Sequence, residues 1–323
     1  MTKMGASEVP PPGRYGPREV GLLAATSIVW GAAYVFIRQG LVFGAAPLAF
    51  ASARYLLSAA AFAILAAARR EALPSRRDLL VSAGIGGTLI IGLYGGFLYW
   101  GEQYTTGGYA AVLASTAPLM TVAVGFSLLS AERLGRRGLL GMGVGFVGAT
   151  VLVVPELTGI DALGSWEGPP FILMAIASTA VGTVLLRRLG RGRQGLWQIG
   201  SQFTVAGTML GVAALVIPGG RTLPLTAGVL EMLGILVAFS SIIGYFAYFA
   251  LHHRVGPVRA NVVAYIAPLV GVAVGTGAYG EMLTAWEIVG VVVVLSGVGL
   301  VLLDSARRTP VAPASPRPTP RGD

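Results

Sequence analysis

The stretch YIAPLVGVAVGTGAYGEMLTAWEIVG, Tyr265 to Gly290, decides the fold of this chain. Apart from glycines and two threonines it is almost entirely apolar, with Pro268 early in the run and the first charge, Glu281, well after it. Lipid offers no hydrogen-bond partners, so an apolar run that crosses a membrane folds as a helix whose backbone groups bond one another. The stretch therefore predicts the end of one membrane helix, a short turn at Glu281 and the start of the next helix.

The composition of the whole chain agrees with a membrane protein. Hydrophobic residues make up 54% of the 323 positions and charged residues only 11%, whereas a soluble domain carries about 25% charged residues. Apolar runs long enough to cross a hydrocarbon core of about 30 Å recur along the sequence. We therefore predict an all-α integral membrane protein with ten transmembrane helices. The predicted spans are 20–37, 46–68, 79–100, 107–128, 137–154, 168–186, 197–217, 229–251, 257–278 and 284–303.

The basic residues predict how these spans are oriented. Of the 23 lysines and arginines, all except Arg38, Arg54 and Arg221 lie in the two tails or in alternate loops on one side. Cytoplasmic loops are the ones that retain Lys and Arg, so we expect both termini in the cytoplasm. The tails at 1–19 and 304–323 are rich in proline or glycine, and we expect them to be disordered.

A second copy of the opening stretch lies earlier in the chain, in STAPLMTVAVGFSLLSAERLGRRGLLG, Ser115 to Gly141. Pro118 corresponds to Pro268 at an offset of 150, and Glu132 corresponds to Glu281 at an offset of 149. Matched proline, glutamate and glycine positions at a nearly constant offset indicate a duplication.

The duplication divides the ten spans into two sets of five. Because five is odd, the second set enters the membrane from the opposite side. We predict two inverted repeats, 20–154 and 168–303, joined by an outward-facing linker at 155–167. Transporters built in this way bind substrate near the membrane midplane, between the repeats.

Several classes of function lack the residues they need. The net charge is +9, but the basic residues lie between apolar runs rather than on one soluble face, so we expect no nucleic-acid partner. The chain has no cysteine, hence no thiolate metal site, and no Walker A lysine motif. We predict a protein that is not an enzyme and needs no metal or cofactor. Its expected partners are the lipid bilayer and a small-molecule substrate, and its expected state is a monomer or homodimer.

Four segments resemble the EamA-type family of the drug/metabolite transporter (DMT) superfamily. They are WGAAYVFIR from Trp30, PLAFASARYLLSA from Pro47, YTTGGYAAVLASTAPL…AERLG from Tyr104, and VGPVRANVVAYIAPL…GEMLTAWEIVG from Val255. The resemblance covers about residues 20–303. It implies a ten-helix carrier that works by alternating access and exports amino acids or similar small amphipathic metabolites across the bacterial inner membrane. In the sixth helix, where the family often has a tryptophan, this chain has Thr179-Ala180-Val181-Gly182.

Three other functions remain open: a proton-coupled multidrug carrier, an efflux carrier for other metabolites, and a passive channel. By the predicted boundaries no Asp or Glu lies near the middle of a span, and a proton relay inside a membrane needs such groups. We therefore expect facilitated diffusion or exchange driven by the gradient of the substrate itself.

Aromatic and polar residues inside the spans are the candidates for substrate binding. Their polar groups are unfavourable in lipid and should face the interior. Trp30 and Tyr34 are four residues apart and so share one face of a helix. For Tyr99, near a span end, the alternative is an interfacial aromatic belt. The candidates are Trp30, Tyr34, Arg54, Tyr94, Tyr99, Gln103, Ser115, Tyr245, Tyr248, Asn261 and Tyr265.

Arg54 is the charged candidate among them. It lies roughly 12 Å inside its span at 1.5 Å per residue, and a charge at that depth needs a partner. A substrate carboxylate, Glu102 or helix carbonyl groups can supply one. The alternative is a side chain that reaches back to the outer headgroups.

The duplicated prolines and glutamates are predicted to have structural roles. Pro118 and Pro268 should kink their helices, because a proline inside a helix removes one hydrogen bond. We expect Glu132 and Glu281 to end short turns and to accept hydrogen bonds from backbone amides at the start of the following helix.

Overall fold

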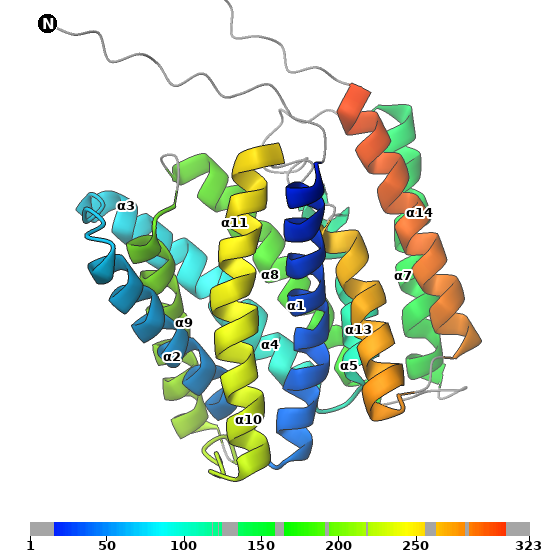
Figure 1. Ribbon diagram of the computed structural model, residues 1–323. Coiled ribbons are helices and arrows are strands. Elements are labelled where there is room, and N and C mark those ends of the chain that lie inside the picture. The colour runs from blue at the N-terminus through cyan, green and yellow to red at the C-terminus, as the bar shows by residue number, and fades with distance from the viewer. Residues whose placement is uncertain are drawn as a thin grey trace, which may run out of the picture.

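A computed structural model describes residues 16–117, 119–121, 123–124, 135–158, 165–190, 194–217, 219–255, 263–281 and 284–307 of the chain. Over these residues the chain is helical with short turns and contains no strand (Figure 1). The helices of the first half are α1 (Pro17–Val42), α2 (Pro47–Ala68), α3 (Arg76–Val81), η1 (Ser82–Leu93), α4 (Tyr94–Gly101), α5 (Gly107–Ala114) and α7 (Arg136–Thr158). Those of the second half are α8 (Gly168–Leu189), α9 (Leu196–Val216), α10 (Ala227–Ile235), η2 (Leu236–Ile243), α11 (Gly244–Val255), α13 (Val263–Tyr279) and α14 (Ala285–Arg307).

The helices begin where the sequence supplies acceptors for the unpaired amides of a first turn. Thr106 accepts from the Tyr109 amide at 3.1 Å to start α5, and Thr226 accepts from the Val229 amide at 3.4 Å to start α10. At α9 the acceptor comes from a distant part of the chain. The Glu71 carboxylate, just after α2, accepts from the Leu196 amide at 2.9 Å. This contact fixes the end of α2 against the start of α9.

Helix α2 of the first half and helix α9 of the second half run in opposite directions. The end of α2 meets the start of α9 at Glu71 and Leu196. In the peripheral pair, α7 and α14 lie side by side along their length (Figure 1). Their glycines allow close approach, since a Cβ on Gly297 would collide with the backbone of Gly145 and Gly141. Such small-residue contacts are how membrane helices pack without a hydrophobic driving force.

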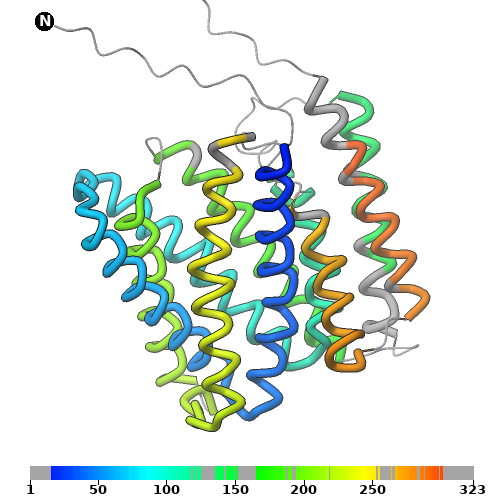
Figure 2. The backbone as a smooth tube through the Cα atoms, viewed as in Figure 1, coloured from blue at the N-terminus to red at the C-terminus, as the bar shows by residue number. Residues whose placement is uncertain are grey.

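The two ends of the bundle carry different connections. Helix α1 begins and α14 ends at the same end of the bundle, which we call the termini end (Figure 2). The turn between α1 and α2 lies at the opposite end, the far end. The start of α8 also lies at the far end, because the Ser165 amide donates to the Tyr104 carbonyl at 2.8 Å and Arg38 of α1 contacts the neighbouring Gln103. Helices α1 and α8 are therefore antiparallel.

Two helical segments have π rather than α geometry: η1, between α3 and α4, and η2, between α10 and α11. They end at Leu93 and Ile243, which are related by the same offset of 150 that relates Pro118 to Pro268. π-Helical turns are rare and are frequent at functional sites. Both segments border the central cavity described below.

Within the residues that the structure describes, six helical segments are long and apolar enough to cross a membrane. They are Pro17–Val42, Pro47–Ala68, Arg76–Gly101, Gly168–Leu186, Leu196–Val216 and Ala227–Leu251. Of the shorter apolar helices in the described residues, Ile266–Tyr279 lies in the stretch Tyr265–Gly290 that opened the sequence analysis, and Ile288–Gly297 begins at its end. Each of the six coincides with one of the ten predicted spans, and the prediction of an all-helical membrane protein is confirmed. The full count of ten stays a prediction.

Candidate functional site

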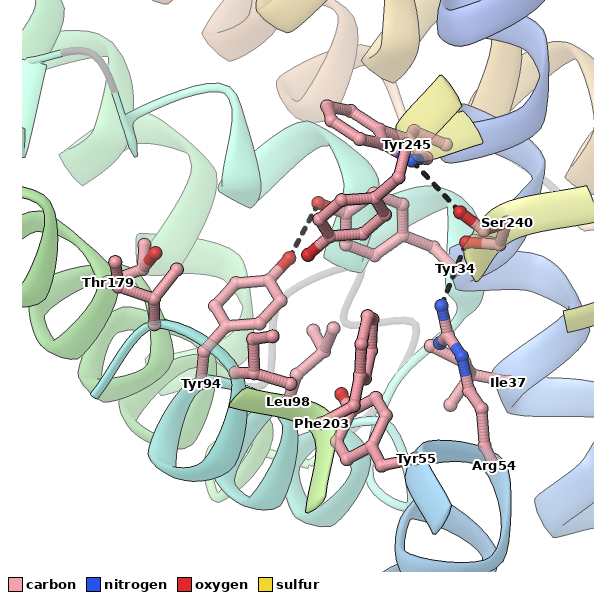
Figure 3. A pocket seen from close by; sticks show the side chains of 14 residues that line it. Tyr34, Ile37, Arg54, Tyr55, Tyr94, Leu98, Thr179, Phe203, Ser240 and Tyr245 are labelled. Carbon is pink, nitrogen blue, oxygen red and sulfur yellow. Dashed lines mark hydrogen bonds between the residues drawn. The ribbon is translucent and has the colours of Figure 1, made fainter. Parts of the chain in front are cut away.

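A central cavity of about 220 Å³ lies between helices of both halves (Figure 3). The elements that border it are α1, α2, η1, α4, α8, α9, η2 and α11. Its walls are aromatic and aliphatic with a few polar groups, the composition of most small-molecule sites. The lining residues are Trp30, Ala33, Tyr34, Ile37, Arg54, Tyr55, Ile90, Ile91, Tyr94, Leu98, Thr179, Phe203, Ser240 and Tyr245.

Trp30 organises the aromatic wall of the cavity. Its indole N–H donates to the Ser240 carbonyl of η2 at 3.2 Å, which fixes the orientation of the ring. The ring then meets Tyr245 edge-on at 5.7 Å between centroids and Tyr248 at 4.9 Å. Each such pair adds about 0.5–1.5 kcal/mol beyond the burial of apolar area. Phe203 of α9 extends the cluster and lies 5.4 Å from Tyr245.

One turn along α1, Tyr34 faces Tyr94 of α4. The two phenol oxygens are 3.1 Å apart and share a hydrogen bond across the cavity, as Figure 3 shows. The bond joins the first helix of the chain to the segment that follows η1. It gives the cavity a polar site opposite the aromatic cluster.

Arg54 supplies the charge of the cavity. Its guanidinium donates to three hydroxyls, those of Tyr99 at 3.0 Å, Ser240 at 2.8 Å and Ser241 at 3.4 Å. The side chain is only 8% exposed. Among the residues that the structure describes, no carboxylate lies within salt-bridge distance of it. A buried cation held only by neutral dipoles is costly, so the cavity favours an anionic group beside Arg54.

These partners differ from those expected from the sequence. Neither Glu102 nor helix carbonyl groups hold Arg54; hydroxyl groups do. The alternative of a side chain that reaches the headgroups is wrong, because the guanidinium is buried in the bundle. The hydroxyl partners could have been found from the sequence, because the serine pair in LVAFSSIIGYF stands out in an otherwise apolar run.

A second cavity of about 170 Å³ lies on the other side of Trp30 and Tyr34. Tyr248, Ala267 and Pro268 contribute to its lining. Trp30 and Tyr34 thus separate two compartments, and the first of them holds the charge of Arg54.

The structure brings five of the eleven candidate residues together in the central cavity. Trp30, Tyr34, Arg54, Tyr94 and Tyr245 line the central cavity, and Tyr248 lines the second one.

Three candidates lie behind the cavity walls. Tyr99 is fully buried and supports Arg54, so the alternative of an interfacial belt is wrong for it. Gln103 lies in the turn after α4, where its amide donates to the Trp100 carbonyl. Ser115 is 2% exposed and follows α5 without lining either cavity.

Four of the predicted positions lie outside the described residues or have undescribed side chains. Pro118, Glu132 and Asn261 are outside the described ranges, and the side chain of Tyr265 is not described. Their predicted roles stay predictions.

Some lining residues were not anticipated from the sequence. Tyr55 neighbours Arg54 in the chain and could have been found on that basis. Phe203 and Ile91 are ordinary apolar residues of membrane helices, and no sequence signal separates them from lipid-facing neighbours. Thr179 occupies the place where the family often has a tryptophan, and the structure puts it in the cavity wall.

The contact of Glu281 corrects another expectation. Its carboxylate accepts from the amides of Gly107 at 3.1 Å and Gly108 at 2.8 Å. These amides begin α5, not the helix that follows Glu281, so the predicted partner was wrong. The N-terminus of a helix favours negative charge. Glu281 therefore joins the second half of the chain to the first.

Comparison with known proteins agrees with this architecture. The sequence pattern of the EamA-like transporter family matches residues 18–154 and again residues 166–303. The uncharacterized inner membrane transporter YedA of Escherichia coli (strain K12) is 32% identical over 285 residues, which cover 88% of this chain and 90% of YedA. The uncharacterized transporter YvbV of Bacillus subtilis (strain 168) is 25% identical over 87% of this chain and 90% of its own length.

A solved crystal structure of another protein has the same fold. It superposes with a TM-score of 0.58 at 15% sequence identity and covers 90% of this chain and 99% of that one. The chain belongs to the EamA-like transporter family, within the drug/metabolite transporter type, and is a multi-pass membrane protein.

Proposed function

We propose that this protein is an alternating-access carrier that exports amino acids or similar small amphipathic metabolites across the bacterial inner membrane. The observation that carries the proposal is the pairing, in one central cavity, of a cluster of aromatic rings and a guanidinium that has no counter-ion among the described residues. A carboxylate beside Arg54 and an apolar group against Trp30 would both be satisfied by one amphipathic molecule.

The size of the cavity supports a small substrate. Its volume of about 220 Å³ is below the range of about 300–1,000 Å³ typical of drug-sized ligands. A metabolite of amino-acid size therefore suits the site better than a bulky drug.

The architecture supports alternating access between two inverted five-helix repeats. The family pattern matches the chain twice, α1 and α8 are antiparallel, and so are α2 and α9. We infer ten membrane helices, five in a repeat at 20–154 and five in a repeat at 168–303, with both termini in the cytoplasm. The basic loops support this orientation, because cytoplasmic loops retain Lys and Arg.

The first test is a thermal-shift screen of the purified protein against the natural amino acids and simple analogues. We expect the midpoint to rise with amphipathic, carboxylate-bearing ligands and not with their methyl esters, because the ester removes the charge that Arg54 would bind. No shift with any amphipathic amino acid would remove the proposed substrate class.

The second test is counterflow in proteoliposomes loaded with the ligand that gave a shift. A carrier exchanges labelled external substrate for unlabelled internal substrate, and the uptake saturates. Unsaturable flux with single-channel currents would instead identify a channel. Uptake that follows an imposed pH gradient would contradict transport driven by the substrate gradient alone.

A further inference from the structure

A buried carboxyl group lies just beyond the central cavity, in the turn between α4 and α5. Glu102 directly follows the apolar span Arg76–Gly101 and is 0% exposed. Among the described residues, neither of its two carboxyl oxygens has a hydrogen-bond partner, and no cation lies within salt-bridge distance. Buried carboxyl groups are normally paired, so this arrangement needs an explanation.

The charges around Glu102 are committed elsewhere. Arg38 of α1 donates to the Gln103 carbonyl at 3.1 Å, and Arg54 of α2 donates to hydroxyl groups. Glu281 accepts from the two amides that begin α5. Each neighbour has partners of its own, whereas Glu102 has none among the residues that the structure describes.

Other titratable groups face the same region. Glu167 precedes α8, which packs on Gly101 at the end of α4. Four phenols of the cavity and its wall are close enough to interact electrostatically with Glu102. They are Tyr34, Tyr55, Tyr94 and Tyr99. Glu102 is thus next to the substrate cavity, at its far end.

The neutral form of this carboxyl suits its buried position. An ionised carboxylate buried without a partner costs several kcal/mol. Burial raises the pKa of Glu102 well above its usual range. The charge of Arg38 lowers this pKa, that of Glu281 raises it and that of Arg54 lowers it, each by less than burial does. A group with a raised pKa keeps its proton until the surroundings change.

The position of Glu102 makes such a change part of opening. The turn that carries it is enclosed by the end of α1, the start of α8 and the contact between Glu281 and α5. Separation of these elements would admit water to the carboxyl. It would also free Arg38 to pair with the carboxylate.

We propose that Glu102 is a proton-binding site that couples closure of the far end to protonation: the carboxyl holds a proton while the far end is closed and releases it to water when the far end opens. The proposal rests on the alternating-access function proposed above, and it adds a proton to the cycle at a position that is not inside a predicted span. The sign follows directly. Because the closed form binds the extra proton, low pH favours closure and rising pH favours opening.

The absence of cysteine from the sequence makes the test direct. Thr105→Cys places a single thiol three residues from Glu102, at a position that is 2% exposed. Its rate of maleimide labelling is measured between pH 5 and pH 9 in proteoliposomes without substrate. Rates are divided by those of Leu225→Cys, which is 77% exposed and reports the intrinsic pH dependence of the thiol.

With Glu102 present, we expect the normalised rate to rise with pH, by up to about tenfold per pH unit, the limit for one proton. Glu102→Gln, which cannot lose a proton, should label slowly at every pH. Glu231→Gln removes an exposed carboxyl of α10 and should leave the profile unchanged. A flat profile with Glu102 present, or an unchanged profile in Glu102→Gln, would overturn the proposal.

A second variant keeps the test decisive if Glu102→Gln does not fold. Glu102→Asp retains the carboxyl but shortens it, and it should keep the pH dependence with a shifted midpoint; an unshifted midpoint would also overturn the proposal. The labelling needs no substrate. A pH-dependent profile together with no amino-acid binding would therefore contradict the proposed substrate class and leave the proton site standing.

Discussion

Helices α1 and α8 are the first helices of the two halves of the chain. They contribute different side chains to the wall of the central cavity. Arg38 of α1 corresponds to Arg187 of α8 at an offset of 149, and the same offset relates Trp30 to Thr179. Both Trp30 and Thr179 line the central cavity, and Figure 3 shows Thr179 on the side away from Arg54. Equivalent positions therefore face the same space with very different side chains.

The packing around α8 explains why it contributes a small side chain to the cavity wall. A Cβ on Gly182, one turn after Thr179, would approach Leu89 and Ile90 of η1 to less than 3.0 Å. Helix α8 thus lies close against the π-helical segment, whereas α1 holds a large indole that is fixed by a hydrogen bond to η2. A duplicated scaffold can therefore form an asymmetric site. Here the wall at α1 offers an aromatic surface to apolar groups, and the wall at α8 leaves space.

Making α1 resemble α8 should have the largest effect. Trp30→Thr removes the bond to the Ser240 carbonyl and the ring contacts with Tyr245 and Tyr248. We expect a loss of stability of up to about 3 kcal/mol and loss of measurable substrate binding. The measurement is thermal unfolding in detergent together with the ligand-induced shift. Trp286→Thr, on an exposed tryptophan of α14, is the matched control; equal losses in both variants would contradict a special role for Trp30.

Removal of the charge should come next. Arg54→Gln leaves the aromatic wall intact but removes the cation that faces it. Hydrogen bonds to charged groups contribute about 1.5–3 kcal/mol, so we expect the affinity for a carboxylate ligand to fall about ten- to a hundredfold. Titration of binding checks this, with the exposed Arg221→Gln as control. Equal affinity for the amino acid in Arg54→Gln would show that the carboxylate binds elsewhere.

Making α8 resemble α1 should have a graded effect. Thr179→Trp places an indole in the open side of the cavity, and overpacking typically costs about 1–3 kcal/mol. Larger substrates should be excluded first, so counterflow of the largest amino acid should fall about tenfold while that of the smallest changes little. Thr276→Trp on an exposed position of α13 should have no such effect. A uniform loss for all substrates would indicate misfolding rather than occlusion.

The smallest expected effect concerns the hydroxyl pair. Tyr34→Phe removes the 3.1 Å contact with Tyr94 but keeps the ring. One neutral hydrogen bond contributes about 0.5–1.5 kcal/mol, so a loss of affinity or stability within about tenfold is expected. Tyr279→Phe, on a partly exposed tyrosine at the end of α13, serves as the control. A loss as large as that of Arg54→Gln would mean that the pair contacts the substrate directly.

The sequence predicted the long membrane helices, but it predicted only some of the residues of the candidate site. The apolar runs predicted the six long membrane helices, and the residue pairs at helical spacing correctly placed Trp30 with Tyr34. The sequence did not predict that Tyr99 lies behind Arg54 or that Phe203 lies in the wall of the central cavity. Those positions depend on the rotation of α4 and α9 about their axes, which neighbours set and local sequence does not.

The partners of the charged groups show the same limit. Glu281 was recognised as an amide acceptor, but its amides belong to α5, which lies 173 residues earlier in the chain. The burial of Glu102 was not predicted at all, because a glutamate directly after an apolar span is expected to meet water. Only the enclosure of that turn by α1 and α8 removes it from water.

The sequence by itself determined that this protein is a helical membrane protein, and its two matching halves predict two inverted repeats. Helix formation in lipid and the placement of basic loops depend on local composition, which acts residue by residue along the chain. The tertiary structure alone decided which residues share a cavity, which hydroxyls hold Arg54 and which carboxyl is left unpaired. Those features arise where helices distant in the sequence meet, and their energies depend on distances and burial that no single segment contains.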